Sequence, residues 1–356
     1  MKLVNQLSMN TAHISLVNNG LKSFKEFYVA NEDDYQDIHH LLENESMELS
    51  DYVRLKYTRR PDLFGSYLES GQIPAIITDK EKKFLGVVSE TSIMQYGESR
   101  KVYYTSDLRI SKSAGLRTRA NFRKAYLEVL AELPHDCYTV VLKDNEKAIK
   151  ALTRGQSDLY YHKVYEYVSR AIVVLPTFRL IKDRSDKFDI YEEKNHSYVK
   201  ERIEKSAFAN VVNEEDTAFC IRKAGKVVGQ FSISRPEKRS LFVESKSTKV
   251  SFWLKALRMI FGHQYERKIP WCYITSLYLD EDLNKSEVIE YICRYLYLKN
   301  YISSGELLLL CHGAKESINP HLYAPEFLTR GNLYKVSSCN YATELSGEVY
   351  LNPIAL

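Results

Sequence analysis

The sequence predicts an α/β protein of two domains. Strand-like and helix-like patterns alternate along the whole chain, and the same order of elements occurs twice. The length of 356 residues agrees with this prediction, because a single hydrophobic core stops growing at about 250 to 300 residues. We therefore expect a first domain over residues 1–176 and a second over residues 177–356, with Pro176 marking the boundary.

The composition is that of an ordinary globular protein, with 44% hydrophobic and 27% charged residues. The net charge of +4 is small for a chain of this size. It does not favour nucleic acid as a partner, since that function needs a concentrated basic face. No run of eighteen apolar residues and no secretory signal occurs. We expect a cytoplasmic protein without a membrane partner, either a monomer or a homodimer.

The six cysteines form no Cys-x-x-Cys pair, so a zinc or thioredoxin-like site is not predicted. Several of them lie in apolar runs, as Cys311 does, and we expect reduced, buried thiols. The sequence also contains no metalloprotease, Walker or Rossmann signature. No metal is therefore expected.

The first domain opens with a polar segment and a strand over residues 24–30. Asn31 is the expected N-cap of a helix, with acidic residues in its first turn. The elements expected after it are a helix through 35–42, a helix over 50–69 interrupted at Pro61, a hairpin of 75–78 and 84–90, a strand over 102–110, a helix ending near 133, a strand over 139–142, a helix after Asn145 and strands over 160–174.

The second domain repeats this order. Its expected elements are a strand over 188–192, a helix over 195–208, a hairpin over 218–234, a helix over 249–261, a strand over 271–279, a helix over 284–298 and a strand over 307–311. Two short matches accompany the repeat. The letters of residues 103–106 resemble those of 273–276, and residues 152–155 are identical to 328–331. Together they indicate an internal duplication.

The segment from Val102 to Leu133 is the strongest functional signal in the chain. A β-branched and aromatic strand leads through a turn into a helix whose apolar residues recur every three or four positions. Lys112, Arg117 and Arg119 lie in the turn and the first helical turn. Cations there oppose the helix dipole by about 0.3 to 1 kcal/mol each. Such an arrangement favours a bound anion, and we predict a phosphate site.

The order of elements and two local motifs resemble the GNAT superfamily of N-acetyltransferases. The Leu108-Arg109-Ile110 strand leads into residues 111–120, which are similar to the family's Arg/Gln-x-x-Gly-x-Gly/Ala turn. Residues 145–149 are similar to its Asn-x-x-Ala-x motif. The resemblance covers residues 24–174 and, more weakly, 188–345. It implies that each domain has a mixed, mostly antiparallel central sheet flanked by helices.

The resemblance also implies acetyl-CoA as a co-substrate. Its pyrophosphate would lie on the backbone amides of the turn, and its pantetheine would run between two splayed strands. The cofactor-binding residues implied in this way are Leu108, Ile110, Gly115, Leu116, Arg117, Thr118, Arg119, Ala120 and Asn145. This chain departs from the motif, since Thr118 adds a Cβ where the family has glycine. Leu152 stands where the family often has a tyrosine.

Acetyl transfer to an amine needs a base and a group that protonates or stabilises the leaving side. Asp107 and Glu90 are the candidate bases, on the strands that line the acceptor side in the family's fold. Tyr160, or its neighbour Tyr161, is the candidate acid. The alternatives are exposed strand carboxylates and packing tyrosines, and Asn145 could serve only as an N-cap.

These patterns predict transfer of an acetyl group from acetyl-CoA to the amine of a small molecule or protein, by direct attack in a ternary complex. The corresponding turn of the second domain, residues 280–285, is acidic and would repel a polyphosphate. That domain is expected to shape the acceptor cleft. The alternatives are a CoA-binding or protein-interaction module without turnover, and nucleic-acid binding through the cluster from Arg117 to Lys124.

Overall fold

The structure is a computed structural model that describes residues 2–44, 47–48, 53–58, 63–153, 159–194, 197–210, 216–235, 240–245, 255, 259, 270–338 and 344–351. The helices are α1 (Lys2–Leu21), α2 (Tyr35–Asn44), α3 (Leu63–Leu68), α4 (Leu116–Ala131), α5 (Glu146–Thr153), α6 (Ser197–Glu204) and α8 (Lys285–Leu298), with 3-10 turns η1 (Glu32–Asp34) and η2 (Pro176–Leu180).

The strands of the first half are β1 (Phe27–Val29), β2 (Met47–Glu48), β3 (Val53–Thr58), β4 (Ile73–Asp79), β5 (Phe84–Gln95), β6 (Glu98–Ile110), β7 (Cys137–Leu142) and β8 (Tyr160–Val173). Those of the second half are β9 (Asp189–Glu193), β10 (Phe208–Asn210), β11 (Thr217–Lys223), β12 (Lys226–Ser234), β13 (Ser240–Ser245), β14 (Trp271–Leu279), β15 (Leu307–Gly313), β16 (Glu326–Ser337) and β17 (Val349–Tyr350).

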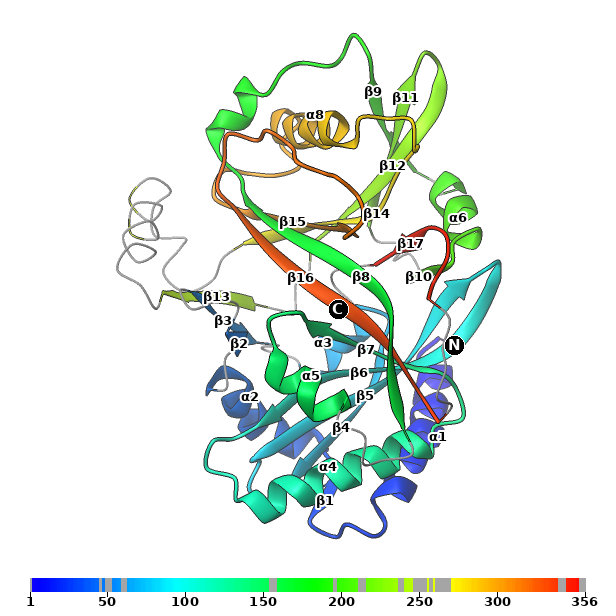
Figure 1. Cartoon of the computed structure of the whole chain (residues 1–356), viewed down its shortest axis with the longest axis vertical. Coiled ribbons are helices and arrows are strands. Elements are labelled where there is room, and N and C mark those ends of the chain that lie inside the picture. The colour runs from blue at the N-terminus through cyan, green and yellow to red at the C-terminus, as the bar shows by residue number, and fades with distance from the viewer. Residues whose placement is uncertain are drawn as a thin grey trace.

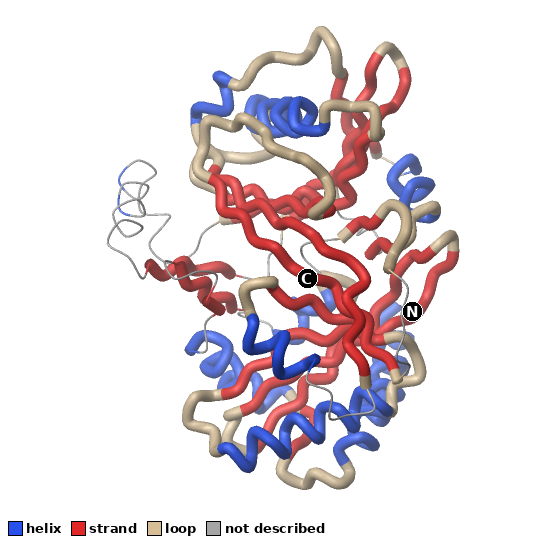
Figure 2. Tube along the Cα trace, viewed as in Figure 1, coloured by secondary structure: helices blue, strands red, loops and turns tan. Residues whose placement is uncertain are grey.

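Within the described residues, one large sheet runs through the whole molecule, and helices flank it in both halves (Figures 1 and 2). Its strand order is β1-β4-β5-β6-β7-β16-β8-β15-β14-β12-β11-β9, with β10 and β17 at its side. Most neighbours are antiparallel, whereas the pairs β6–β7, β14–β15 and β10–β17 are parallel. The expected α/β architecture of mixed, mostly antiparallel sheets is confirmed.

The two halves exchange strands at the centre of the sheet. β7 of the first half pairs with β16 from the end of the chain, while β15 of the second half pairs with β8 of the first (Figure 1). β8 and β16 then pair with each other over their full length. Because each half borrows a strand from the other, the halves share one continuous hydrogen-bonded sheet.

Different helices cover the two faces of the first-half strands. α1 and α4 pack on one face, around the buried residues Val17, Phe84, Val88, Tyr103, Phe122 and Val129. α2 and α3 pack on the other, around Ile38, Leu42, Leu63, Tyr67, Ile76 and Val87. Each fully buried aliphatic or aromatic side chain contributes about 1.5 to 3 kcal/mol. In the second half, buried residues of α8 pack on the sheet.

Glycine allows α4 to come close to its neighbours. A Cβ added at Gly86 would lie 3.0 Å from the Tyr126 ring and 3.2 Å from the Phe122 ring. One added at Gly20 of α1 would lie 2.6 Å from the Cα of Val129. α4 can therefore lie this close to the sheet and to α1 only because Gly86 and Gly20 have no side chain.

The structure corrects one sequence-based expectation in the first half and adds an element for which no expectation was made. The helix expected over residues 50–69 is instead strand β3 followed by the short helix α3. β3 pairs with β13, which lies almost two hundred residues away and was invisible to a local pattern. The polar segment before residue 24, for which no element was expected, contains helix α1, which buries Val17 and Leu21.

Other expectations fail in the second half. The helix expected over 195–208 ends at Glu204, and Phe208 begins β10. The identical segments 152–155 and 328–331 are not equivalent, because Leu152 and Thr153 lie in α5 whereas the later copy lies in β16. Residues 154–155 fall outside the described residues, as does the helix expected over 249–261 apart from residues 255 and 259.

The described cysteines are free thiols, and all but Cys311 are buried. Burial raises the pKa of the Cys220 thiol to about 11. Cys339 lies outside the described residues. Across the described ranges, no helix combines the length and apolar character needed to cross a membrane, and no three metal-binding side chains cluster together.

Arg170 joins the exchanged strands. It lies on β8 with 3% of its surface exposed, and its Nη1 is 2.8 Å from the Glu326 carboxylate at the start of β16. Its Nε donates to Nε2 of His312 on β15, at 3.1 Å, while Nδ1 of His312 donates to the Gly313 carbonyl. These two bonds require a neutral imidazole, and burial lowers the pKa of His312 below its ordinary value of 6.5.

We predict that this junction makes stability depend on pH. Because the folded pKa of His312 is lowered, the folded state binds fewer protons than the unfolded state below about pH 6.5, and stability is lost as the pH falls through that window. Thermal unfolding at pH 7.5 and pH 5.5 measures this loss. The variant His312→Gln, which cannot become charged, should lose less; an equal loss would contradict the assignment.

Candidate active site

The site is built where two parallel strands part. β6 and β7 pair only from Tyr103–Cys137 to Thr105–Thr139, where the Thr139 hydroxyl donates to the Thr105 carbonyl at 3.0 Å. Beyond this point β6 continues beside β5, and β7 continues beside β16. None of the described strands pairs with the inner edges of the parted strands. Their backbone groups can therefore bind an extended, amide-bearing chain.

A β-bulge in β6 lies at the same point. Between the pairs Val87–Ser106 and Leu85–Arg109, two residues of β6 oppose one of β5, and Asp107 has a φ of +48°. The bulge places the side chains of Ser106 and Asp107 on one face of the sheet, the face that α2 and α3 cover. Sheet alternation alone would have put them on opposite faces.

Asp107 is held in place by two partners. The Tyr67 hydroxyl donates to Oδ2 of Asp107 at 2.6 Å, and the Arg109 guanidinium lies 3.8 Å from Oδ1. Only 8% of the Asp107 side chain is exposed. A nearby cation and a donated hydrogen bond both favour the ionised carboxylate. The sequence patterns did not single out Tyr67 as a site residue, although it lies within the helical region expected over residues 50–69.

Glu90 lies on the opposite face from Asp107. It shares its face of β5 with Val88, which packs under α1 and α4, and its carboxylate is 3.0 Å from Nζ of Lys101. Burial, together with the negative charge of Glu90, raises the pKa of Tyr103 to about 12. A single amine cannot reach both Asp107 and Glu90. The structure thus separates the two candidate bases.

Tyr160 lies away from the parting of the strands. It starts β8 opposite Ser337, beyond the pair Val336–Cys137, whereas the strands part after Thr139. The separation along the sheet is about 10 Å at 3.3 Å per residue. Tyr160 is half-exposed and stacks on His162, while the hydroxyl of Tyr161 is buried with no hydrogen-bond partner.

Other tyrosines, which the sequence patterns did not single out, lie closer to the site. Tyr104 and Tyr138 form the last parallel pair but one before the strands part. Tyr167 of β8 lies against Gly331 so closely that a Cβ there would be 2.3 Å from its ring. Glycine inside a strand often marks such a close approach, so Gly331 was a usable signal.

The turn after β6 leaves the start of α4 open. Its N-cap, Gly115, offers no side-chain hydrogen bond, and Leu116 has 86% of its surface exposed. The amide of Arg119 is the first to bond within the helix, to the Gly115 carbonyl at 3.0 Å. The amides of residues 116–118 have no acceptor inside the helix and can bind an anion.

Two of the residues predicted to bind the cofactor make hydrogen bonds within the protein instead. The Arg119 guanidinium donates to the carbonyls of Ser111, Lys112 and Ala114 at 2.9–3.1 Å, so it holds the turn rather than extending from it. Asn145 accepts the amide of Ala148 at 3.1 Å, which makes it the N-cap of α5. Arg117 is exposed beside the open amides. Leu108 is exposed near the end of strand β6, and Ile110 packs towards α4.

The second half repeats the parting of strands but not the open helix. β14 and β15 pair as far as Ile274–Leu310 and then separate, and Ser276, with a φ of +51°, lies in the bulge of β14. The following turn is acidic, and the Asn284 side chain caps α8 by accepting the Glu287 amide at 3.3 Å. An anion is disfavoured there by charge and by the occupied cap.

Known structures share this fold. N-myristoyltransferase from Saccharomyces cerevisiae with bound myristoyl-CoA, itself a GNAT-fold protein, covers 90% of this chain and 84% of its own length, with a TM-score of 0.50 at 11% identity. A second structure of it, with myristoyl-CoA and inhibitors, covers 93% and 84% with the same score and identity. The chain has the GNAT fold.

A GCN5-related N-acetyltransferase from Anabaena variabilis aligns more loosely, with a TM-score of 0.43 at 10% identity over 86% of this chain and 71% of its own. No protein-family model matches the sequence, and no curated protein does. The likeness to the two yeast structures confirms the GNAT fold expected from the sequence.

Proposed function

We propose that the protein transfers an acetyl group from acetyl-CoA to an amine in the first half of this GNAT fold. The observation that carries the proposal is the coincidence of parted strands, a bulge and an uncapped helix start within residues 103–118. The inner edges of β6 and β7 suit the amides of pantetheine, and the amides of residues 116–118 suit the pyrophosphate.

The reaction is direct. The neutral amine attacks the thioester carbonyl carbon, the new C–N bond forms, and the C–S bond breaks. Asp107 takes the proton that the amine loses, and the departing thiolate is protonated to release free CoA. Asp107 lies at the bulge beside the parted strands, and Tyr67 and Arg109 keep it oriented. The products are an N-acetylated acceptor and CoA.

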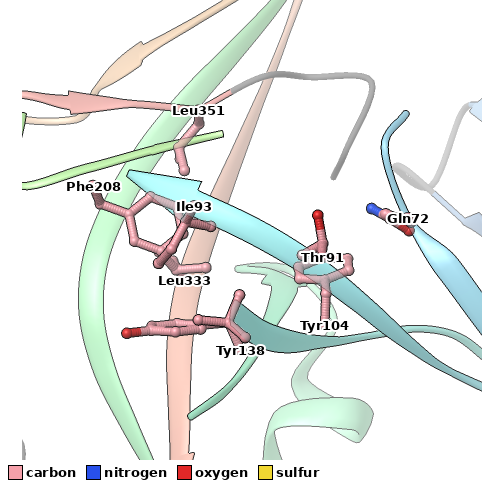
Figure 3. Close-up of a pocket in the computed structure, with 9 residues that line it drawn as sticks. Gln72, Thr91, Ile93, Tyr104, Tyr138, Phe208, Leu333 and Leu351 are labelled. Carbon is pink, nitrogen blue, oxygen red and sulfur yellow. The ribbon is translucent and has the colours of Figure 1, made fainter. Parts of the chain in front are cut away.

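The space beside the parted strands supports a short acyl group. A small apolar recess next to Tyr104 and Tyr138 has a volume of about 10 Å³, roughly the room of a single water-sized group. Phe208, Leu333 and Leu351 close it (Figure 3). A two-carbon acyl group could enter with a small adjustment of these side chains, whereas a long chain would have to displace several of them.

Acetyl-CoA binding should depend on Arg117. Replacing it with glutamate puts a negative charge beside the open amides of α4, and we expect about tenfold weaker binding by calorimetry, equivalent to about 1.4 kcal/mol. Lys124→Glu makes the same charge change about 10 Å further along the helix and should have little effect. Absence of acetyl-CoA binding to the unmodified protein would refute the proposal.

Salt-dependent binding of nucleic acid with which CoA does not compete would favour the alternative function.

Turnover should depend on Asp107 and not on Glu90. Asn tolerates a positive φ, so Asp107→Asn keeps the bulge but removes the base, and thiol release with an amine acceptor should fall about 10²- to 10⁴-fold while acetyl-CoA affinity is retained. Glu90→Gln, on the other face of the sheet, should retain turnover. Binding without any turnover in the unmodified protein would indicate a CoA-binding module instead.

Acyl-chain length should be limited by the recess. Leu333→Ala enlarges it and is expected to improve the use of hexanoyl-CoA relative to acetyl-CoA by about tenfold, since several buried methylenes at about 0.8 kcal/mol each become accommodated. The ratio of kcat/KM values for the two thioesters measures this. Leu298→Ala, the same truncation at an exposed position of α8, serves as the control. A preference that does not change would mean that the acyl group lies elsewhere.

A further inference from the structure

A cavity of about 760 Å³ opens where the second pair of parallel strands parts. Ser276, Leu277 and Tyr278 of β14 line one side, and His312 and Gly313 of β15 line another. The C-terminal segment, residues 344–351, forms a further wall, held by β17 pairing with β10 and by the Leu345 amide on the Val164 carbonyl. The volume lies in the range of specific ligand sites, about 300 to 1,000 Å³.

The two strand edges that face this cavity differ. On β15, side chains of the strand and its turn already use the backbone: the Gly313 amide donates to Glu316, and its carbonyl accepts from His312. On β14, Tyr278 and Leu279 pair with β12 on the outer side, residues 276 and 277 form the bulge, and none of the described strands pairs with residues 276–279 on the inner side. The inner edge of β14 therefore presents backbone donors and acceptors to the cavity.

A nucleotide is a poor occupant of this cavity. Asp280, Glu281 and Asp282 follow β14 directly, and Asn284 fills the helix start that would otherwise receive a phosphate. An extended polypeptide is a good one, because its amides alternate along a line and can add to a strand edge, while its side chains enter the space on either side. The cavity thus favours a peptide over a polyphosphate-bearing ligand.

The cavity and the recess at the proposed acetyl site share one wall residue. Leu351 lines both this cavity and the small recess beside Tyr104 and Tyr138 (Figure 3). Those two tyrosines stand one position before β6 and β7 part. A chain lying along β14 would have one end at Leu351, next to the point where the thioester is expected.

We propose that the acceptor is an extended polypeptide that adds to the inner edge of β14 and presents its amine past Leu351 to the acetyl thioester. This inference rests on the proposed acetyl transfer for its chemistry, but the peptide site can be tested without it. The inner edge of β14 pairs with the backbone of the peptide, and the first half binds acetyl-CoA, the acetyl donor. The N–H bond of the amine is exchanged for an N–acetyl bond, and CoA leaves as the free thiol.

The test is direct binding of a pool of random-sequence, fluorescein-labelled decapeptides, measured by anisotropy in the absence of acetyl-CoA. Ala314→Trp fills the cavity, and Ser317→Trp places the same side chain on an exposed residue of the same turn that does not line it. We expect the unmodified protein and Ser317→Trp to bind the pool, and Ala314→Trp to bind at least tenfold more weakly. All three should bind acetyl-CoA equally.

Hydrogen exchange on the unmodified protein provides a second measurement that does not depend on the folding of a variant. Binding of the pool should slow exchange of the amides of residues 276–279. Equal binding by Ala314→Trp, no protection on β14, or acetylation of small amines such as spermidine without any peptide binding would overturn the proposal. Failure of acetyl-CoA binding, by contrast, would overturn the proposed activity and leave the peptide result to stand separately.

Discussion

The structure depends on parallel strands that are held together for a few residues and then kept apart. A gap between strands normally closes, because unpaired backbone groups are costly. Here each parted strand is bound on its outer side: β6 to β5, β7 to β16, β14 to β12 and β15 to β8. The exchange of β8 and β16 between the halves supplies two of these outer partners. The openings are therefore a consequence of the long-range pairing.

The same architecture leads into different helix starts in the two halves. Both have a bulge with a positive φ, at Asp107 and at Ser276, on the strand that parts. The first half continues into an uncapped helix with basic residues, and the second into an acidic turn with a capped helix. The first helix start can therefore bind an anion, whereas the second disfavours one. The shared lining residue Leu351 brings the two openings together.

The local parts of the site were predictable. The strand and helix within residues 102–133 appear within a few residues of their expected bounds, as β6 and α4, because their periodicity and their turn lie in one short stretch. Predictions failed where a partner lay far away. β3 became a strand because β13 pairs with it, and the identical segments at 152 and 328 fold differently because only the second meets β7 and β8.

The sequence by itself determined the strand, the basic turn and the amphipathic helix, since short-range propensity and charge are written into neighbouring residues. It also determined the fold family through the order of these elements. Only the tertiary structure decided that Asp107 and Glu90 face opposite sides, that Tyr160 lies away from the site, and that Arg119 holds its own turn. A bulge reverses side-chain alternation, and strand exchange joins distant segments. Neither effect leaves a pattern that can be read locally.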